Sequence, residues 1–199
     1  KKDIFKFIDD PKIIRPANYP EGVVGKGYNI YECKGKKIAV INIMGRVDIN
    51  ILTENPFIMA KDMVEEIKEQ VDIIIIDFHA EATAEKICFG RFCSELGVSA
   101  FFGTHTHVQT ADDSIINNMG YITDAGFCGA SDGVIGMEYQ TSLNRFLTCI
   151  PERYEVAEGK TTQVNAVEVE IDSRTGYAIS INRVFCSRDN IEKESEHED

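Results

Sequence analysis

The sequence lacks several features that would assign a protein to a common class at once. It has no apolar run long enough to span a membrane, no CxxC pair, no internal repeat and no signal-peptide pattern at its first residues. Positive charge is also scarce, because 21 Lys and Arg residues face 33 Asp and Glu residues and leave a net charge of −12. We therefore expect no membrane partner and no duplex nucleic-acid partner, since duplex binding depends on Lys and Arg. A metal could still attract a small phosphorylated substrate.

Six cysteines are spread along the chain without a recognisable pattern, at Cys33, Cys88, Cys93, Cys128, Cys149 and Cys186. An even count is weak evidence for disulfides in a chain of 199 residues. We expect reduced, mostly buried thiols and a cytoplasmic location. A redox role for Cys88 and Cys93 is disfavoured, because residues five apart on a helix point about 140° away from each other.

An alternation of helix and strand patterns predicts an α/β fold. The expected elements are a short helix at 3–8, a hairpin with arms at 28–33 and 37–43, a helix at 56–70, a strand at 71–78, a helix at 83–96 and a strand at 98–103. Gly97 fits the C-terminal cap of the third helix. Helix and strand in turn are typical of βαβ units.

The last third of the chain changes character. We expect a short strand at 120–124, a glycine-rich loop at 126–136, a helix at 138–149, and two alternating strands at 161–171 and 177–185 that form a hairpin. The loop is interpreted as a tight connection, although its backbone N–H groups could also contact a phosphate. One domain is expected over residues 1–190, followed by a disordered acidic tail at 191–199.

Three of the four histidines follow apolar strand patterns. His79 ends the first of these segments, and His105 and His107 follow the second. The ends of neighbouring parallel strands lie about 5 Å apart, and ligands bind beyond such ends. We therefore expect the three imidazoles to line one crevice and to hold a transition metal. The alternative interpretation is hydrogen-bonded structural or solvated loop histidines.

Polar residues around the histidines could support such a site. Asp77 and Glu81 flank His79 and could fix the tautomer of an imidazole, while Thr104 and Thr106 could serve as supporting or substrate-contacting residues. Asp112 and Asp124 also lie near in the sequence. Each carboxylate has an alternative role as a helix cap or a solvated acid. No residue stands out as a proton donor, so no catalytic residue is assigned.

Several separate strings resemble one known family, the YmdB-type bacterial branch of the calcineurin-like metallophosphoesterases. They are Arg15-Pro16-Ala17-Asn18-Tyr19-Pro20, Asp77-Phe78-His79-Ala80-Glu81, Gly103-Thr104-His105-Thr106-His107, Tyr121-Ile122-Thr123-Asp124-Ala125-Gly126 and Val156-Ala157-Glu158-Gly159-Lys160. They occur in the same order as in the family, and the resemblance runs from about residue 1 to residue 184.

The resemblance implies a metallophosphoesterase-type β-sandwich of two sheets flanked by helices, with two transition-metal ions. Iron is the first expectation, and manganese or zinc are alternatives. The implied reaction is hydrolysis of 2′,3′-cyclic nucleotides such as 2′,3′-cAMP, or related phosphodiesters, by a hydroxide that bridges the metals. Carried over by motif, His79 and His105 would bind one ion and His107 the other.

The chain also departs from the family pattern. The family's Asp, Glu-Asn and Gly-Asn-His motifs, the last with the expected general acid, do not occur. We expect these ligands and the first sheet strand to lie upstream of Lys1, which leaves the fold incomplete at its N-terminus.

Other functions remain open at this point. A non-catalytic regulatory or assembly module with a vestigial metal site is one alternative. A metal-dependent amidohydrolase is another, which the all-β last third disfavours. Tyr and Met residues at 119–139 could form a contact between copies, so a homo-oligomer is possible.

Overall fold

A computed structural model describes residues 2–159 and 161–187 of the chain. Contacts between Cα atoms divide these residues into two compact units. The first unit comprises residues 2–106, 110–124 and 169–182, and the second comprises residues 107–109, 125–159, 161–168 and 183–187. The single domain at 1–190 stays a prediction, and the expected tail at 191–199 lies outside the described residues.

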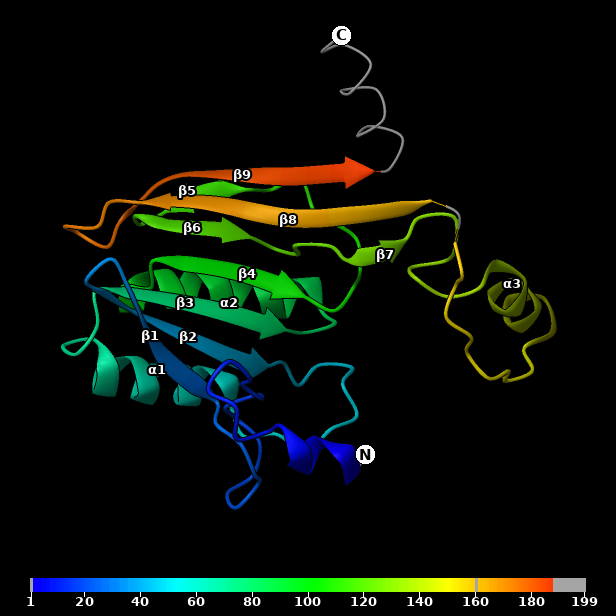
Figure 1. Ribbon diagram of the computed structural model, residues 1–199, viewed down its shortest axis with the longest axis horizontal. Coiled ribbons are helices and arrows are strands. Elements are labelled where there is room, and N and C mark those ends of the chain that lie inside the picture. Colours follow the sequence, from blue (N-terminus) through cyan, green and yellow to red (C-terminus); the bar gives the residue numbers. More distant parts are fainter. Residues whose placement is uncertain (1, 160, 188–199) are drawn as a thin grey trace, which may run out of the picture. The chain divides into compact units, whose positions relative to one another are not determined.

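The first unit contains a six-stranded sheet with the strand order β1-β2-β3-β4-β6-β5 (Figure 1). Its strands are β1 (Tyr28–Cys33), β2 (Lys36–Met44), β3 (Ile73–His79), β4 (Ala100–Thr104), β5 (Ser114–Ile116) and β6 (Met119–Ile122). The four central strands run parallel, and β1 and β5 are antiparallel edge strands. Parallel neighbours end at the same edge of the sheet, so β3 and β4 deliver their last residues side by side.

Two helices connect the central strands, α1 (Pro56–Ile67) between β2 and β3 and α2 (Thr83–Leu96) between β3 and β4. Because crossovers between parallel strands are right-handed, two crossovers in the same direction place both helices on one face of the sheet. Figure 1 shows both helices behind these strands. The Asn55 side chain accepts a hydrogen bond from the Phe57 N–H to cap α1, and Gly97 ends α2 with φ 88°.

The apolar core of the first unit lies between the sheet and these helices. Ile41, Ile76 and Phe78 point inward from β2 and β3 with no exposed surface. The ring of Phe78 lies 4.1 Å from that of Phe89 on α2 and 6.1 Å from that of Phe101 on β4. Phe78 therefore packs β3, the strand that ends at His79, against α2 and β4.

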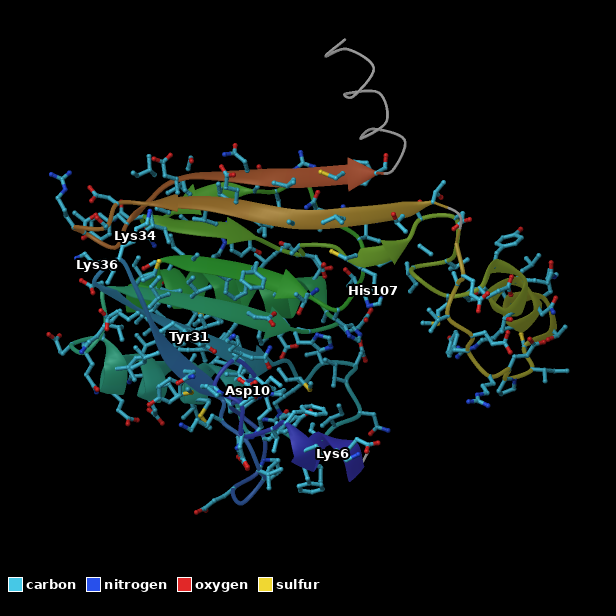
Figure 2. The ribbon with its side chains drawn as sticks, in the orientation of Figure 1. Lys6, Asp10, Tyr31, Lys34, Lys36 and His107 are labelled. Carbon is cyan, nitrogen blue, oxygen red and sulfur yellow. The ribbon has the colours of Figure 1, made fainter. Side chains whose placement is uncertain are left out.

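The β1–β2 hairpin turns within two residues. Lys34 has φ 51° and Gly35 has φ 76°, as a two-residue turn that matches the twist of the strands requires. Figure 2 labels Lys34, in the turn, and Lys36, the first residue after it. The predicted hairpin is confirmed.

The second unit contains β7 (Cys128–Ala130), α3 (Tyr139–Thr148) and parts of two longer strands, β8 (Thr162–Ile171) and β9 (Ala178–Ser187). The second sheet has the order β7-β8-β9, and β7 pairs antiparallel with β8. The Glu138 side chain accepts hydrogen bonds from the N–H groups of Gln140 and Thr141 and so caps α3. These bonds hold the pKa of Glu138 below its usual value.

The observed fold is a mixed α/β fold with two sheets, as predicted. The expected helix at 3–8 is a 3₁₀ helix at Lys2–Lys6, and the helix that was expected to reach residue 70 ends at Ile67. The three-residue strands β5 and β7 were not predicted, because three residues are too few to show an alternating pattern.

The expectation that most cysteines are buried was wrong. Cys93 is buried, but Cys33, Cys88, Cys128 and Cys149 are exposed, because hairpin ends and helix surfaces leave these thiols outside the core. Burial raises the pKa of the Cys93 thiol far above its usual value. Met119 and Tyr121 belong to the core of the first unit, whereas Tyr139 is 56% exposed. A contact between copies through the Tyr and Met residues at 119–139 therefore stays a prediction.

Among the described residues, no helix has the length and apolar character that crossing a membrane would demand.

Phe78→Ala should lower the free energy of unfolding by about 3–5 kcal/mol, because the change leaves a cavity beside the rings of Phe89 and Phe101. The measurement is urea unfolding followed by circular dichroism. Phe5→Ala is the control, because Phe5 is 64% exposed and its loss should cost about 0.5 kcal/mol or less. Equal losses of stability in the two variants would show that Phe78 is not packed in the core of the first unit.

Candidate metal centre

The pairing of β3 with β4 brings His79 and His105 together. His79 is the last residue of β3 and lies opposite Thr104, so His105 is the next residue beyond the sheet edge. The Nε2 atom of His79 lies 3.0 Å from the Nδ1 atom of His105, and the two rings are nearly perpendicular. The sequence-based prediction that these strands are neighbours is confirmed.

A row of hydrogen bonds determines the tautomer of His79. The Thr104 hydroxyl donates its single hydrogen to the carboxylate of Asp77 at 2.9 Å, and the Asn42 side-chain amide donates to the other oxygen of that carboxylate at 2.8 Å. The same hydroxyl lies 3.2 Å from Nδ1 of His79. Because its hydrogen is already given to Asp77, Thr104 accepts from the His79 Nδ1–H. In the neutral ring, the His79 Nε2 atom then has a free lone pair that faces His105.

Glu81 has the corresponding effect on His105. A carboxylate oxygen of Glu81 lies 2.9 Å from Nε2 of His105 and accepts a hydrogen bond from it. In a neutral His105 ring the proton is therefore on Nε2 and the Nδ1 lone pair faces His79. Two lone pairs that face each other at 3.0 Å repel, so a cation or a proton between them is stabilised.

The surroundings of His79 favour its neutral form. Burial lowers the pKa of His79, and the neighbouring His105 lowers it further, against the opposing charge of Asp77. Burial raises the pKa of Asp77, although the hydrogen bonds from Thr104 and Asn42 partly offset this. A neutral imidazole is the form that binds a metal.

The spacing of the two nitrogens fits one shared metal ion. Nitrogens bound at about 2.0–2.1 Å lie about 2.9 Å apart at a 90° ligand angle and about 3.3 Å apart at a tetrahedral angle. The observed 3.0 Å falls between these values. Two imidazole nitrogens suit a first-row transition metal.

The backbone at the site is strained. His105 has φ 109°, in a region that residues with a side chain rarely adopt. Strained backbone persists where the surroundings hold it, and it is concentrated at functional sites. This strain separates His105 from a solvated loop histidine, which would be free to relax.

A buried ion pair holds the loop that carries His105. The carboxylate of Asp124 binds the Lys86 ammonium at 2.6 Å, and both side chains are 1% exposed. The same oxygen, Oδ2, accepts from the backbone N–H and the hydroxyl of Thr106, at 3.1 and 2.7 Å. Thr106 is therefore an anchor for the loop, joined through Asp124 to α2.

Gly103 has a steric role in the same segment. A Cβ atom at this position would overlap the carbonyl oxygen of Thr123, which follows β6. A glycine at the end of β4 therefore lets the two strand ends lie close together before the chain turns into the histidine loop.

His107 belongs to the second unit and has its own partners there. Its Nδ1–H donates to the carbonyl oxygen of Ile135 at 2.9 Å, and its ring stacks on Phe127 with ring centres 5.6 Å apart. The Nε2 atom of a neutral ring then carries a free lone pair, as in His79. His107 also has a positive φ, 63°.

The structure pairs His79 with His105 and orients each through Thr104 or Glu81. In the part of the chain that the structure describes, no group of three or more His, Cys, Asp and Glu side chains is placed to hold a metal ion. Asp112 is a structural residue, whose carboxylate accepts hydrogen bonds from Thr110 and Thr123.

Sequence reasoning missed Asn42, Lys86 and Glu85. Asn42 and Lys86 were missed because a polar residue inside a strand or helix pattern reads as a solvated position. Glu85 accepts from the N–H groups of Arg46 and Val47 and so fixes the loop after β2. The spacing of Lys86 with apolar neighbours on one helix face was the available signal.

Fold and site together define a mixed α/β protein whose strand ends present a pair of tautomer-fixed histidines suited to a metal. The chain belongs to the YmdB-like protein family, whose sequence pattern matches residues 1–184. The predicted family is thereby confirmed.

Named relatives agree with this membership. The chain is 46% identical over 193 residues to the 2′,3′-cyclic-nucleotide 2′-phosphodiesterase of Bacillus subtilis, an alignment that covers 96% of this chain and 72% of that protein. Among solved structures, a hypothetical protein from Thermus thermophilus matches with a TM-score of 0.87 at 31% identity, over 94% of this chain and 72% of the other. A Mycoplasma pneumoniae protein described as a novel phosphatase matches with a TM-score of 0.86 at 33% identity, over 94% and 68%. The prediction of an enzyme is confirmed by these relatives.

Lys86→Met should lower the free energy of unfolding by about 3–5 kcal/mol, because it leaves the Asp124 charge buried without its partner. Urea unfolding measures the change. The matched control is Lys36→Met, which removes the 2.8 Å ion pair with Asp72 on the surface and should change stability little. If both variants lose the same amount, the buried pair is not the anchor of this region.

Proposed function

We propose that the protein hydrolyses a phosphodiester bond of 2′,3′-cyclic nucleotides, or of related phosphodiesters, with two transition-metal ions. The observation that carries the proposal is the pair of facing nitrogens on His79 and His105, each left free by a hydrogen bond at the far side of its ring. The name of the Bacillus subtilis relative supports the substrate class. Iron is the first candidate metal, with manganese or zinc as alternatives.

We assign His79 and His105 to one ion and His107 to the other. His107 is two residues beyond His105, so their Cα atoms are at most about 7 Å apart. Two ions need more donors than these side chains offer. We propose that the remaining ligands and the general acid belong to parts of the full-length protein outside these 199 residues, in line with the 72% of the Bacillus relative that the chain covers.

The side chains present would orient the centre. Thr104, supported by Asp77, holds the His79 ring with Nε2 toward the ion. Glu81 does the same for Nδ1 of His105 and adds negative charge that favours a bound cation. When bound, two ions supply positive charge to the phosphoryl oxygens and lower the pKa of a water. Thr106 keeps the His105 loop in position through Asp124.

The same proposal extends to the architecture and location. We propose a metallophosphoesterase-type β-sandwich within one domain at 1–190, in a cytoplasmic enzyme. The six cysteines, all free thiols in the structure, agree with a reducing compartment. A homo-oligomer stays a prediction.

His105→Ala in the full-length protein should remove a ligand from one ion. We expect the bound metal to fall by about one ion per chain and kcat/KM for 2′,3′-cAMP to fall by at least about 100-fold. Elemental analysis measures the metal and product release measures turnover. Unchanged metal content and turnover would refute the assignment.

Val108→Ala is the control for this substitution, since it shortens an exposed side chain of the same loop. It should keep both the metal and the activity. A wild-type protein that binds no metal when iron, manganese and zinc are supplied would instead favour a non-catalytic module.

Thr104→Val should weaken metal affinity about 10- to 100-fold, because it removes the hydroxyl that fixes the His79 tautomer and keeps the side-chain volume. Thr104→Ser is the matched control, since it keeps the hydroxyl and should restore most of the affinity. Metal titration of the stripped protein gives the two constants. Equal affinity in both variants would show that the hydroxyl does not orient His79.

A further inference from the structure

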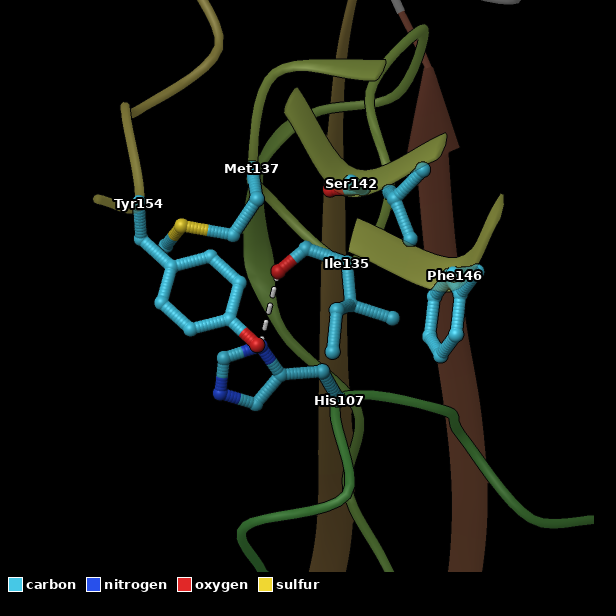
Figure 3. A pocket seen from close by; sticks show the side chains of 7 residues that line it. His107, Ile135, Met137, Ser142, Phe146 and Tyr154 are labelled. Carbon is cyan, nitrogen blue, oxygen red and sulfur yellow. Dashed lines mark hydrogen bonds between the residues drawn. The ribbon is translucent and has the colours of Figure 1, made fainter. Parts of the chain in front are cut away.

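The second unit contains a pocket of about 290 Å³ beside His107. Val134, Ile135, Met137, Ser142, Phe146 and Tyr154 form the rest of its lining. Figure 3 shows the rings of Tyr154 and Phe146 on opposite sides of the Ile135 side chain, with the imidazole of His107 at one end. Of the residues that line this pocket, only His107 is also assigned to the metal centre.

The pocket has an apolar, aromatic wall that is open to solvent. Phe146 on α3 is 78% exposed and Tyr154 is 54% exposed. Burial of such large aromatic side chains is strongly favourable, so a ligand that covers them would be stabilised. The guanidinium of Arg145 lies 4.9 Å from the centre of the Tyr154 ring and helps to hold it. Two exposed rings and a methionine around one hollow are suited to a flat, weakly polar ring.

Few polar groups of the pocket are free to bind a phosphate or a sugar. The hydroxyl of Ser142 donates to the Glu138 carbonyl oxygen at 2.8 Å. The Nδ1–H of His107 is taken by the carbonyl oxygen of Ile135. The lining carries no Lys or Arg. A charged ligand would therefore be disfavoured inside, and an aromatic ring favoured.

His107 lines this pocket and is also the residue assigned above to the second ion. We propose that the pocket binds the base of the nucleotide substrate, by stacking against the ring of Tyr154 or Phe146. The inference rests on the proposed function and adds the part of the substrate that is recognised. The volume, near the lower limit of about 300–1,000 Å³ for small-molecule sites, suits a base and part of a ribose.

The test compares two substrates of the full-length protein, 2′,3′-cAMP and the 2′,3′-cyclic phosphate of methyl riboside, which has no base. Phe146→Ala and Tyr154→Leu should lower kcat/KM for 2′,3′-cAMP by about 5- to 100-fold, chiefly through KM, since each removes a stacking surface. Both variants should leave the base-free substrate within about twofold of the wild type. Equal losses on both substrates would overturn the proposal.

Leu147→Ala is the matched control. Leu147 neighbours Phe146 on α3, is 73% exposed and does not line the pocket. It should behave as the wild type on both substrates. If Leu147→Ala and Phe146→Ala instead change the oligomeric state together, the surface is a contact between copies and the proposal is wrong.

Direct binding separates this inference from the proposed function. Adenosine, which has no phosphate, should bind the wild type and Leu147→Ala alike and bind Phe146→Ala at least fivefold more weakly, by saturation-transfer NMR. If the wild type cleaves neither substrate, the proposed function fails, and adenosine binding still decides the pocket. Adenosine binding that is unchanged by Phe146→Ala and Tyr154→Leu would refute the base site alone.

Discussion

The ion pair between Lys86 and Asp124 is the constraint on which the candidate centre depends. Two charges with 1% exposure lose nearly all of their hydration, and only close pairing with further hydrogen bonds makes this tolerable. Asp124 obtains those bonds from Thr106, so the loop after β4 completes the solvation of the pair. The Asp124 carboxylate, two residues after the end of β6, thereby ties helix α2 to the histidine loop.

The chemistry of the centre follows from that fixed loop. In-register parallel pairing places His79 beside Thr104, and the anchored loop then turns His105 back toward His79 with a strained backbone. Asn42, Asp77 and Thr104 form a row of hydrogen bonds that ends at Nδ1 of His79, and Glu81 separately accepts from Nε2 of His105, so each imidazole has one nitrogen engaged. The two remaining nitrogens face each other, which is the arrangement that a shared cation stabilises. In the second unit, His107 likewise donates its Nδ1–H, to the Ile135 carbonyl oxygen, which leaves its Nε2 atom free.

Much of the fold was predictable where the pattern was long. The helix at 83–96 and the strands around it have enough residues for a period to be visible, and Gly97 marks the helix end. Because parallel strands joined by one helix are neighbours, the approach of His79 and His105 was also predictable. The three-residue strands and the exposure of most cysteines were not, since these depend on which segments pair or cover each other.

By itself the sequence determined the order of helices and strands and the residues at the strand ends, because periodicity and glycine positions act locally. The string from Gly103 to His107 likewise marked the candidate site and, with the other strings, the family. Only the tertiary structure decided which nitrogen of each ring is free, that Thr106 donates to Asp124, and that Lys86 is buried. These depend on hydrogen bonds between residues distant in the chain, such as Lys86 and Asp124, and no local pattern encodes their distances.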